Sequence, residues 1–211
     1  MTLQLTDEDG EYLVRLARRA ITLFLTEGKT LEEQPPTSEL REKAGAFVTL
    51  KTYPEGRLRG CIGYPEPVLP LYRAVIQAAI SAATQDPRFY PVTPGELPNL
   101  TVEVSVLTPP EPLRVDDRRK LPDLIRVGRD GLIIRAGPWS GLLLPQVPVE
   151  WGWDSREFLD QTCVKAGLPP GCWMRPDVEV LRFTAIVFAE ERPMGRVVRE
   201  RLTASEGHGL R

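Results

Sequence analysis

The amino-acid sequence predicts an α+β fold, in which a mainly antiparallel sheet with flanking helices forms two intertwined subdomains. The main observation is a series of short strand-like segments joined by tight turns, which is typical of antiparallel hairpins. The turns at 53–56 and 128–131 are the clearest of these. Longer segments with apolar residues at helical spacing are interspersed with the hairpins, and they supply the flanking helices.

The first half of the chain, approximately 1–108, accounts for three of the predicted helices and for the clearest strand. Thr6 caps the first helix and Gly28 stops it. The strand over 100–107 has apolar residues at every even position, with Thr101, Glu103 and Ser105 on its other face. In order, the predicted elements are a helix over 7–27, a short helix over 38–44, strands over 46–52 and 57–63, a helix over 71–85 and the strand over 100–107.

The second half, approximately 123–190, is rich in hairpins. A polar connection over 109–122 precedes it, which we expect to be the most mobile internal segment. Asp154 and Glu157 have the spacing of a capping box, and Gly167 follows as a stop. The predicted elements are strands over 125–127, 132–136 and 141–144, a helix over 154–166 and a strand over 178–189, followed by a charged tail over 191–211.

Composition limits the classes of function. The chain has 211 residues, and its 27 basic and 29 acidic residues give a net charge of -2, so nothing indicates a nucleic-acid partner. No apolar run approaches the roughly 18 residues that a membrane span needs. The N-terminus lacks the basic and then apolar pattern of a signal peptide, so we expect a cytoplasmic protein.

Cysteine and histidine usage restricts the chemistry further. Cys61, Cys163 and Cys172 cannot all be paired and form no C-x-x-C site, which argues against a disulfide framework and against structural zinc. The single histidine, His208, lies in the polar tail, where it is poorly placed to serve as the base of a triad or dyad. No nucleotide-binding glycine motif is present, so we predict no cofactor and no metal.

The stretch 57–63 reads Arg-Leu-Arg-Gly-Cys-Ile-Gly and concentrates the candidate chemistry. Alternate side chains share a face of a strand, so Arg59 and Cys61 lie together. Cys61 is a candidate reactive thiol, although an unpaired cysteine is also commonly a small buried apolar residue. Gly60 and Gly63 either present backbone N–H groups to an anion or allow close packing.

Further candidates lie elsewhere along the chain. Glu103 and Glu150 are possible general bases, and burial beside Trp151 and Trp153 would raise the pKa of Glu150. Arg88 has the chemistry to bind an anionic substrate, but could equally pair with Asp86.

Several motifs together resemble the AMMECR family. They include 58–63, 86–89, 102–110, 128–131 and 140–153, and the segment 141–148, Gly-Leu-Leu-Leu-Pro-Gln-Val-Pro, is especially distinctive. The resemblance implies a single two-part α+β domain over 1–211, with an unsettled biochemical role. It also implies an association with Memo-like and radical-SAM proteins as partners.

Two hypotheses follow for the function. The first is an enzyme that acts on a small anionic substrate in a cleft around residues 59–63. The candidate catalytic residues are then Cys61, Glu103 and Glu150, and the candidate ligand-binding residues are Arg59, Gly60, Gly63, Arg88 and Gln146. The alternative is a non-catalytic module that binds protein or nucleic acid through its basic runs at 114–120 and 192–201. Acidic residues dilute both runs, which is typical of solvated surface.

Overall fold

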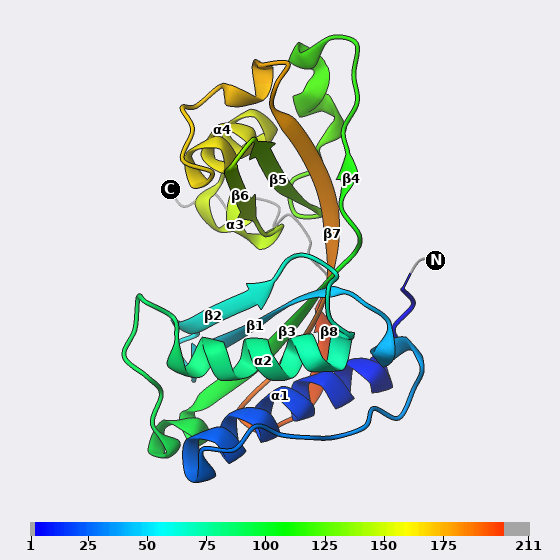
Figure 1. Ribbon diagram of the computed structural model, residues 1–211. Helices are drawn as coiled ribbons and strands as arrows, with labels where there is room; N and C mark the ends of the chain where they lie inside the picture. The colour runs from blue at the N-terminus through cyan, green and yellow to red at the C-terminus, as the bar shows by residue number, and fades with distance from the viewer. Residues whose placement is uncertain (1–2, 201–211) are drawn as a thin grey trace. The chain divides into compact units, whose positions relative to one another are not determined.

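The computed structural model describes residues 3–200, and it confirms the predicted α+β class with an antiparallel sheet (Figure 1). These residues divide into two compact units. The first unit comprises 3–109 together with 186–200, and the second comprises 110–185. Strand β7 (Glu179–Glu190) begins in the second unit and ends in the first, so the two units share one continuous strand.

The first unit is a sheet with two helices packed on one face. Neighbouring strands follow the order β2-β1-β3-β7, and β8 pairs with β7. Figure 1 shows α1 and α2 side by side over the strands. The elements are α1 (Asp7–Glu27), β1 (Gly45–Thr52), β2 (Leu58–Tyr64), α2 (Leu71–Thr84), β3 (Leu100–Leu107) and β8 (Val197–Glu200). The predicted helix over 38–44 is only a 3-10 turn, Glu39–Arg41, and a second 3-10 helix covers Pro94–Asn99.

The helix ends in this unit follow from the sequence. Thr6 and Asp9 form the capping box of α1, and Gly28 ends the helix with a φ of 67°. The strands place alternate residues in the core beneath the helices, where Val48 and Leu50 of β1 are fully buried. Residues between them, such as Thr49, therefore occupy the opposite face of the sheet.

The second unit contains a smaller sheet with short helices. Strand β5 pairs with both β6 and β7, and β4 pairs with β7. The elements are β4 (Glu111–Pro112), the 3-10 helix Arg118–Leu124, β5 (Asp130–Ala136), β6 (Trp139–Leu143), α3 (Gln146–Trp151), α4 (Ser155–Lys165) and the 3-10 helix Cys172–Met174. Helix α3 was not predicted from the sequence, and the segment 109–122, predicted as a connection, includes β4 and part of a 3-10 helix.

The predicted strand over 125–127 is wrong. A side chain closes this segment into a turn, because the Asp130 carboxylate accepts the Arg126 N–H at 2.8 Å. The Asp130 N–H donates in turn to the Arg126 carbonyl at 2.9 Å. A carboxylate that binds a backbone N–H competes with strand pairing, and hydrophobic periodicity does not detect it.

Cys163 and Cys172 are joined by a disulfide, contrary to the expectation from cysteine spacing. They lie nine residues apart, at the end of α4 and the start of the next 3-10 helix. Gly167 and Gly171 both have a φ near +80°, a conformation that turns the chain back and that glycine adopts readily. Cys61 is the free cysteine. Within residues 3–200, no helix is long and apolar enough to cross a membrane. His208 lies outside the described residues.

Candidate functional site

Cys61 lies in a row of polar residues that crosses three strands of the first unit. Thr49 of β1 faces Cys61 of β2 on one side and Glu103 of β3 on the other. The Thr49 hydroxyl donates to the Cys61 sulfur, with an Oγ1–Sγ distance of 3.3 Å. Thr49 and Glu103 are each 5% exposed, and Cys61 is partly exposed. The row lies on the sheet face opposite α1 and α2.

Asp86, just after α2, connects Cys61 with Arg88. Its Oδ2 accepts the backbone N–H of Cys61 at 2.9 Å. The same carboxylate pairs bidentately with the Arg88 guanidinium, at 3.0 Å to Nε and 2.8 Å to Nη2. The hydrogen bonds from the Arg88 side chain lower the pKa of Asp86 to about 2. Asp86 is buried while the Arg88 side chain is 55% exposed, so a fixed carboxylate holds a guanidinium that solvent can reach.

Arg59 already has partners on the neighbouring 3-10 helix and loop. Its guanidinium contacts the Glu96 carboxylate at 2.9 and 3.3 Å, and Nη1 donates to the Tyr90 carbonyl at 2.9 Å. The Phe89 ring lies under both guanidinium groups, 5.9 Å from that of Arg59 and 5.5 Å from that of Arg88. Arg59 therefore helps to build the wall of the site, and Arg88 is the more available cation.

The surroundings of the Cys61 thiol favour its protonated form. Burial raises its pKa first, and the nearby Glu103 and Asp86 carboxylates raise it further. The hydrogen bond from Thr49 and the charge of Arg88 act in the opposite direction but do not compensate. At neutral pH Cys61 is therefore a neutral thiol, because even an ordinary cysteine has a pKa of about 8.5.

Gly60 and Gly63 allow close packing. A Cβ atom on Gly60 would lie 2.1 Å from the Ala82 carbonyl oxygen of α2. One on Gly63 would lie 2.3 Å from the Phe47 ring and 2.4 Å from the Ala46 carbonyl oxygen. Both contacts are far inside van der Waals distance, so each glycine is required by its neighbour whether or not a ligand binds.

Two further polar residues near Cys61, Lys51 and Thr49, were not among the candidates predicted from the sequence. Lys51 pairs with Glu103 at 2.8 Å, so that carboxylate is occupied by a cation. The Ser105 hydroxyl is fully buried and has no hydrogen-bond partner among residues 3–200. Asp86 contacts the Cys61 backbone from the segment after α2, and the sequence had indicated it only as a partner of Arg88. The two-residue period of the strands would have placed Thr49 beside Cys61 once the β1–β2 register was known.

The other two candidates, Gln146 and Glu150, belong to helix α3 of the second unit. Glu150 is exposed, so the burial that made it a candidate base is absent. Trp151 and Trp153 stack with ring centroids 6.0 Å apart, and Trp151 is 70% exposed. The Gln146 side-chain oxygen is buried without a hydrogen-bond partner among the residues the structure describes. Within 3–200, no group of three or more His, Cys, Asp and Glu side chains could hold a metal ion.

Comparison with known proteins agrees with the resemblance drawn from the motifs. The AMMECR1 family model matches residues 14–188. The chain belongs to the AMMECR1 family. Protein MK0488 of Methanopyrus kandleri is 58% identical over 204 residues, which cover 96% of this chain and 98% of that protein. Protein TK0174 of Thermococcus kodakarensis is also 58% identical, over 94% of this chain and 98% of its own.

The fold of an AMMECR1 relative is known from crystallography. The uncharacterized protein PH0010 from Pyrococcus horikoshii superimposes with a TM-score of 0.90 at 56% identity, over 93% of this chain and 98% of that one. The names of these relatives state no activity.

Proposed function

We propose that this AMMECR1-family protein is an enzyme that binds a small anionic substrate at Arg88 and acts on it with the Cys61 thiol. The observation that carries this proposal is the double role of Asp86. One buried carboxylate binds the backbone of Cys61 and the side chain of Arg88, so a reachable guanidinium is held beside a partly exposed thiol.

An anion is the ligand that Arg88 suits best. Asp86 occupies the Nε and Nη2 side of its guanidinium, whereas Nη1 has no hydrogen-bond partner within residues 3–200. A planar guanidinium can bind a second anion through its free edge, and carboxylate and phosphate groups match its geometry. Phe89 beneath the guanidinium restricts its movement. Arg88 is therefore oriented before a substrate binds.

The raised pKa of Cys61 suits a proton donor better than a resting nucleophile. A bound anion would raise this pKa further, since like charges disfavour the thiolate. In the proposed step the proton passes from the sulfur to a basic atom of the substrate, and the negative charge remains on the sulfur. The Thr49 hydroxyl and the Arg88 guanidinium then stabilise that charge.

The alternative of a nucleic-acid-binding module has weaker support. In the first basic run, Arg118 donates to the Trp173 and Val178 carbonyls and Arg119 pairs with Asp117. In the second run, Arg199 pairs with Asp7. Cations with internal partners offer less charge to a phosphate backbone.

A comparison of two alkylating reagents tests the proposal. Iodoacetate is an anion and iodoacetamide is neutral, and both react with the same thiolate, so the ratio of their rates does not depend on the thiol pKa. We expect this ratio at Cys61 to be about three- to tenfold higher in the native protein than in the urea-unfolded chain, because Arg88 attracts the anion. Mass spectrometry follows the label, and Cys163 and Cys172 are protected by their disulfide.

The matched variants are Arg88→Gln and Arg57→Gln. Arg57 is an exposed arginine of the β1–β2 turn region. Its replacement by glutamine removes one positive charge, as Arg88→Gln does, and therefore controls for the change in net charge. Arg88→Gln should abolish the preference for iodoacetate, and Arg57→Gln should preserve most of it. Equal ratios in native and unfolded protein would overturn the anion site. If Cys61 is labelled only in the unfolded chain, the thiol is inaccessible in the native protein and cannot have the proposed catalytic role.

A further inference from the structure

We infer that the first unit has a second binding site, for a zwitterionic ligand of the α-amino acid class, in the cavity between loop 30–34 and helix α2. The cavity has a volume of about 410 Å³, within the range of small-molecule sites. Its lining includes the Glu33 carboxylate and the Arg73 guanidinium, both with unused hydrogen-bonding capacity, and apolar side chains beside them. The site is independent of Cys61 and of the function proposed above.

The acidic group is Glu33, and two contacts fix its position. Its Oε1 accepts the Tyr12 hydroxyl at 2.9 Å and the Arg19 Nη2 at 2.7 Å. Burial, and then the hydrogen bond to Glu33, raise the pKa of Tyr12 to about 12, so the hydroxyl remains a donor at all physiological pH values. Oε2 of Glu33 has no hydrogen-bond partner among residues 3–200. One carboxylate oxygen therefore stays available to a ligand ammonium group.

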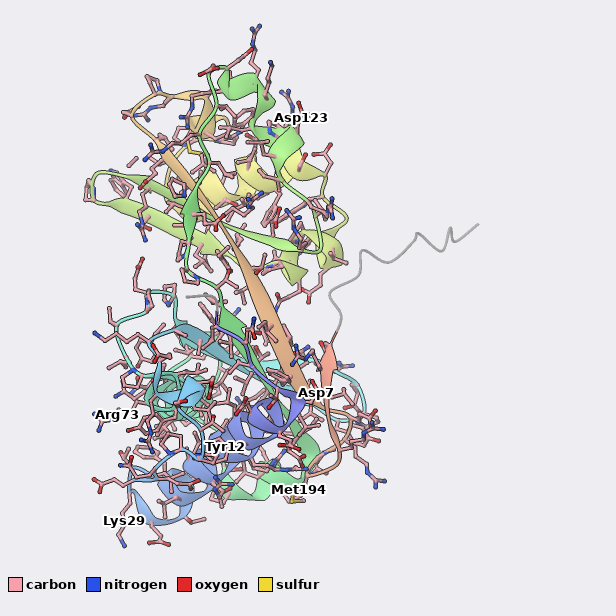
Figure 2. The ribbon with its side chains drawn as sticks, turned by 90° about the vertical axis from the view of Figure 1, so that its right-hand side faces the viewer. Asp7, Tyr12, Lys29, Arg73, Asp123 and Met194 are labelled. Atoms are coloured by element: carbon pink, nitrogen blue, oxygen red, sulfur yellow. A yellow bond between two sulfur atoms is a disulfide. The ribbon has the colours of Figure 1, made fainter. Side chains whose placement is uncertain are left out.

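The basic group is Arg73 of α2, which Figure 2 labels together with Tyr12. Its Nε donates to the Tyr72 hydroxyl at 3.0 Å, and its guanidinium lies 5.8 Å from the centroid of the Tyr72 ring. These contacts position the guanidinium, yet neither supplies a negative charge. Both terminal amino groups lack a hydrogen-bond partner in the described part of the chain. Together they offer the fork that binds a carboxylate bidentately.

The combination of groups selects the class of ligand. The carboxylates of Glu32 and Glu33 and the guanidinium of Arg73 line the same cavity, so a simple anion there would meet two like charges and a simple cation would meet one. A ligand that carries both charges can pair its negative group with Arg73 and its positive group with Glu33. Leu31 and Ile76 line the same cavity, so an apolar side chain would bury surface there. A free amino acid with an aliphatic side chain meets all three requirements.

Three related probes test this inference by isothermal titration calorimetry on the full chain. L-leucine carries both charges, N-acetyl-L-leucine only the negative one, and L-leucinamide only the positive one. We expect L-leucine to bind at least about tenfold more tightly than either analogue, because each analogue leaves either the Arg73 guanidinium or the free Oε2 of Glu33 without a ligand contact. No binding of L-leucine, or equal affinity for all three probes, would overturn the inference.

Two variants test the roles assigned to Arg73 and Glu33. Arg73→Gln should abolish the preference for L-leucine over L-leucinamide, and Glu33→Gln should abolish its preference over N-acetyl-L-leucine. Glutamine at position 33 keeps an acceptor for Tyr12, so the loop retains that contact. Arg57→Gln and Glu55→Gln, two exposed positions outside the cavity lining, are the controls for net charge. Preferences that survive both cavity variants would contradict the assigned roles, and thermal unfolding of each variant verifies that it is folded.

Discussion

Within residues 3–200, the first unit buries 29 apolar residues in one cluster, whereas the cluster of the second unit contains 13. The first cluster fills the space between the sheet and two helices of 21 and 14 residues. The second lies beside α4, a helix of 11 residues, and includes both cysteines of the disulfide. Apolar burial is the main favourable contribution to folding, so the second unit has less of it to offset chain entropy.

The second unit compensates with local cross-links. The disulfide closes the turn after α4, and the Asp160 carboxylate accepts both the Gly171 N–H and the Trp173 indole N–H at 2.7 Å in the same segment. Asp130, which is fully buried, closes the turn before β5 in a similar way. Small cores are commonly supplemented by cross-links of this kind. Because the two units depend on different kinds of contact, the loss of a single contact should affect the unfolding of each unit differently.

One device is common to both units. Strand β7 carries a phenylalanine in each, and each ring lies against a glycine. A Cβ on Gly131 would lie 2.2 Å from Phe183 in the second unit, and one on Gly10 would lie 2.0 Å from Phe188 in the first. The absence of a side chain at these glycines is therefore a packing requirement of the aromatic rings.

The largest effect is expected from Glu190, a buried charged group that joins several elements of the first unit. Its buried carboxylate binds Arg18 of α1 at 2.5 and 2.8 Å and accepts the Val102 N–H of β3 at 3.1 Å. Glu190→Gln leaves the nearly buried Arg18 guanidinium without its counter-charge. We expect the free energy of unfolding, measured in urea, to fall by about 3–5 kcal/mol.

The control is Glu27→Gln at the end of α1, which breaks an exposed pair with Lys29 just after the helix. It should change the free energy of unfolding by no more than about 0.5 kcal/mol. If Glu190→Gln were equally harmless, the ion pairs of Glu190 would contribute nothing measurable, and the apolar core would remain the main difference in stability between the two units.

A smaller and local effect is expected from the disulfide. Replacing both Cys163 and Cys172 with alanine removes a cross-link over a nine-residue separation. Loop-closure entropy predicts a loss of about 2–3 kcal/mol. Because the bridge joins α4 to the next 3-10 helix, hydrogen exchange should accelerate in the second unit while α1 and α2 keep their protection.

Cys61→Ala provides the control, since its sulfur is not part of a disulfide. Treatment with a reductant should lower the melting temperature of the wild type and of Cys61→Ala, and leave the double alanine variant unchanged. Equal acceleration of exchange in both units would show that they unfold together, and the distinction between them would then be lost.

The sequence predicted most of the fold because the longer elements depend on local signals. The capping box at Thr6 and Asp9, the stop at Gly28 and the alternation over 100–107 all lie within one element. The failures occur where a distant or polar contact decides the structure. The turn at 126–130 depends on the Asp130 carboxylate, and the disulfide depends on a turn whose shape two glycines permit.

The candidate site was predictable only in part. Strand periodicity identified Cys61 and Arg59 as neighbours, but no nearby sequence signal indicated that the Glu96 carboxylate would pair with the Arg59 guanidinium. Asp86 was considered only as a partner of Arg88, and its bond to the Cys61 backbone spans 25 residues. Long-range side-chain contacts of this kind leave no periodic pattern in the sequence. They decide which of the two arginines remains available.

The smallest effect is expected from the Asp86 carboxylate. Its size shows whether the ion pair with Arg88 stabilises the first unit. The pKa of Asp86 is about 2, below its ordinary 3.8, so its stabilisation is complete above about pH 4 and is lost as the pH falls through about 2. Because Arg88 is largely exposed, we expect a stabilisation of only about 1–2 kcal/mol.

The measurement is the free energy of unfolding of the wild type and of Asp86→Asn between pH 5 and pH 2. The difference between the two should shrink across this interval, since asparagine keeps an acceptor for the Cys61 N–H but carries no titrating charge. A difference that stays constant down to pH 2 would mean that the charge of Asp86 contributes nothing, and the ion pair that orients Arg88 beside the thiol would lose its energetic basis.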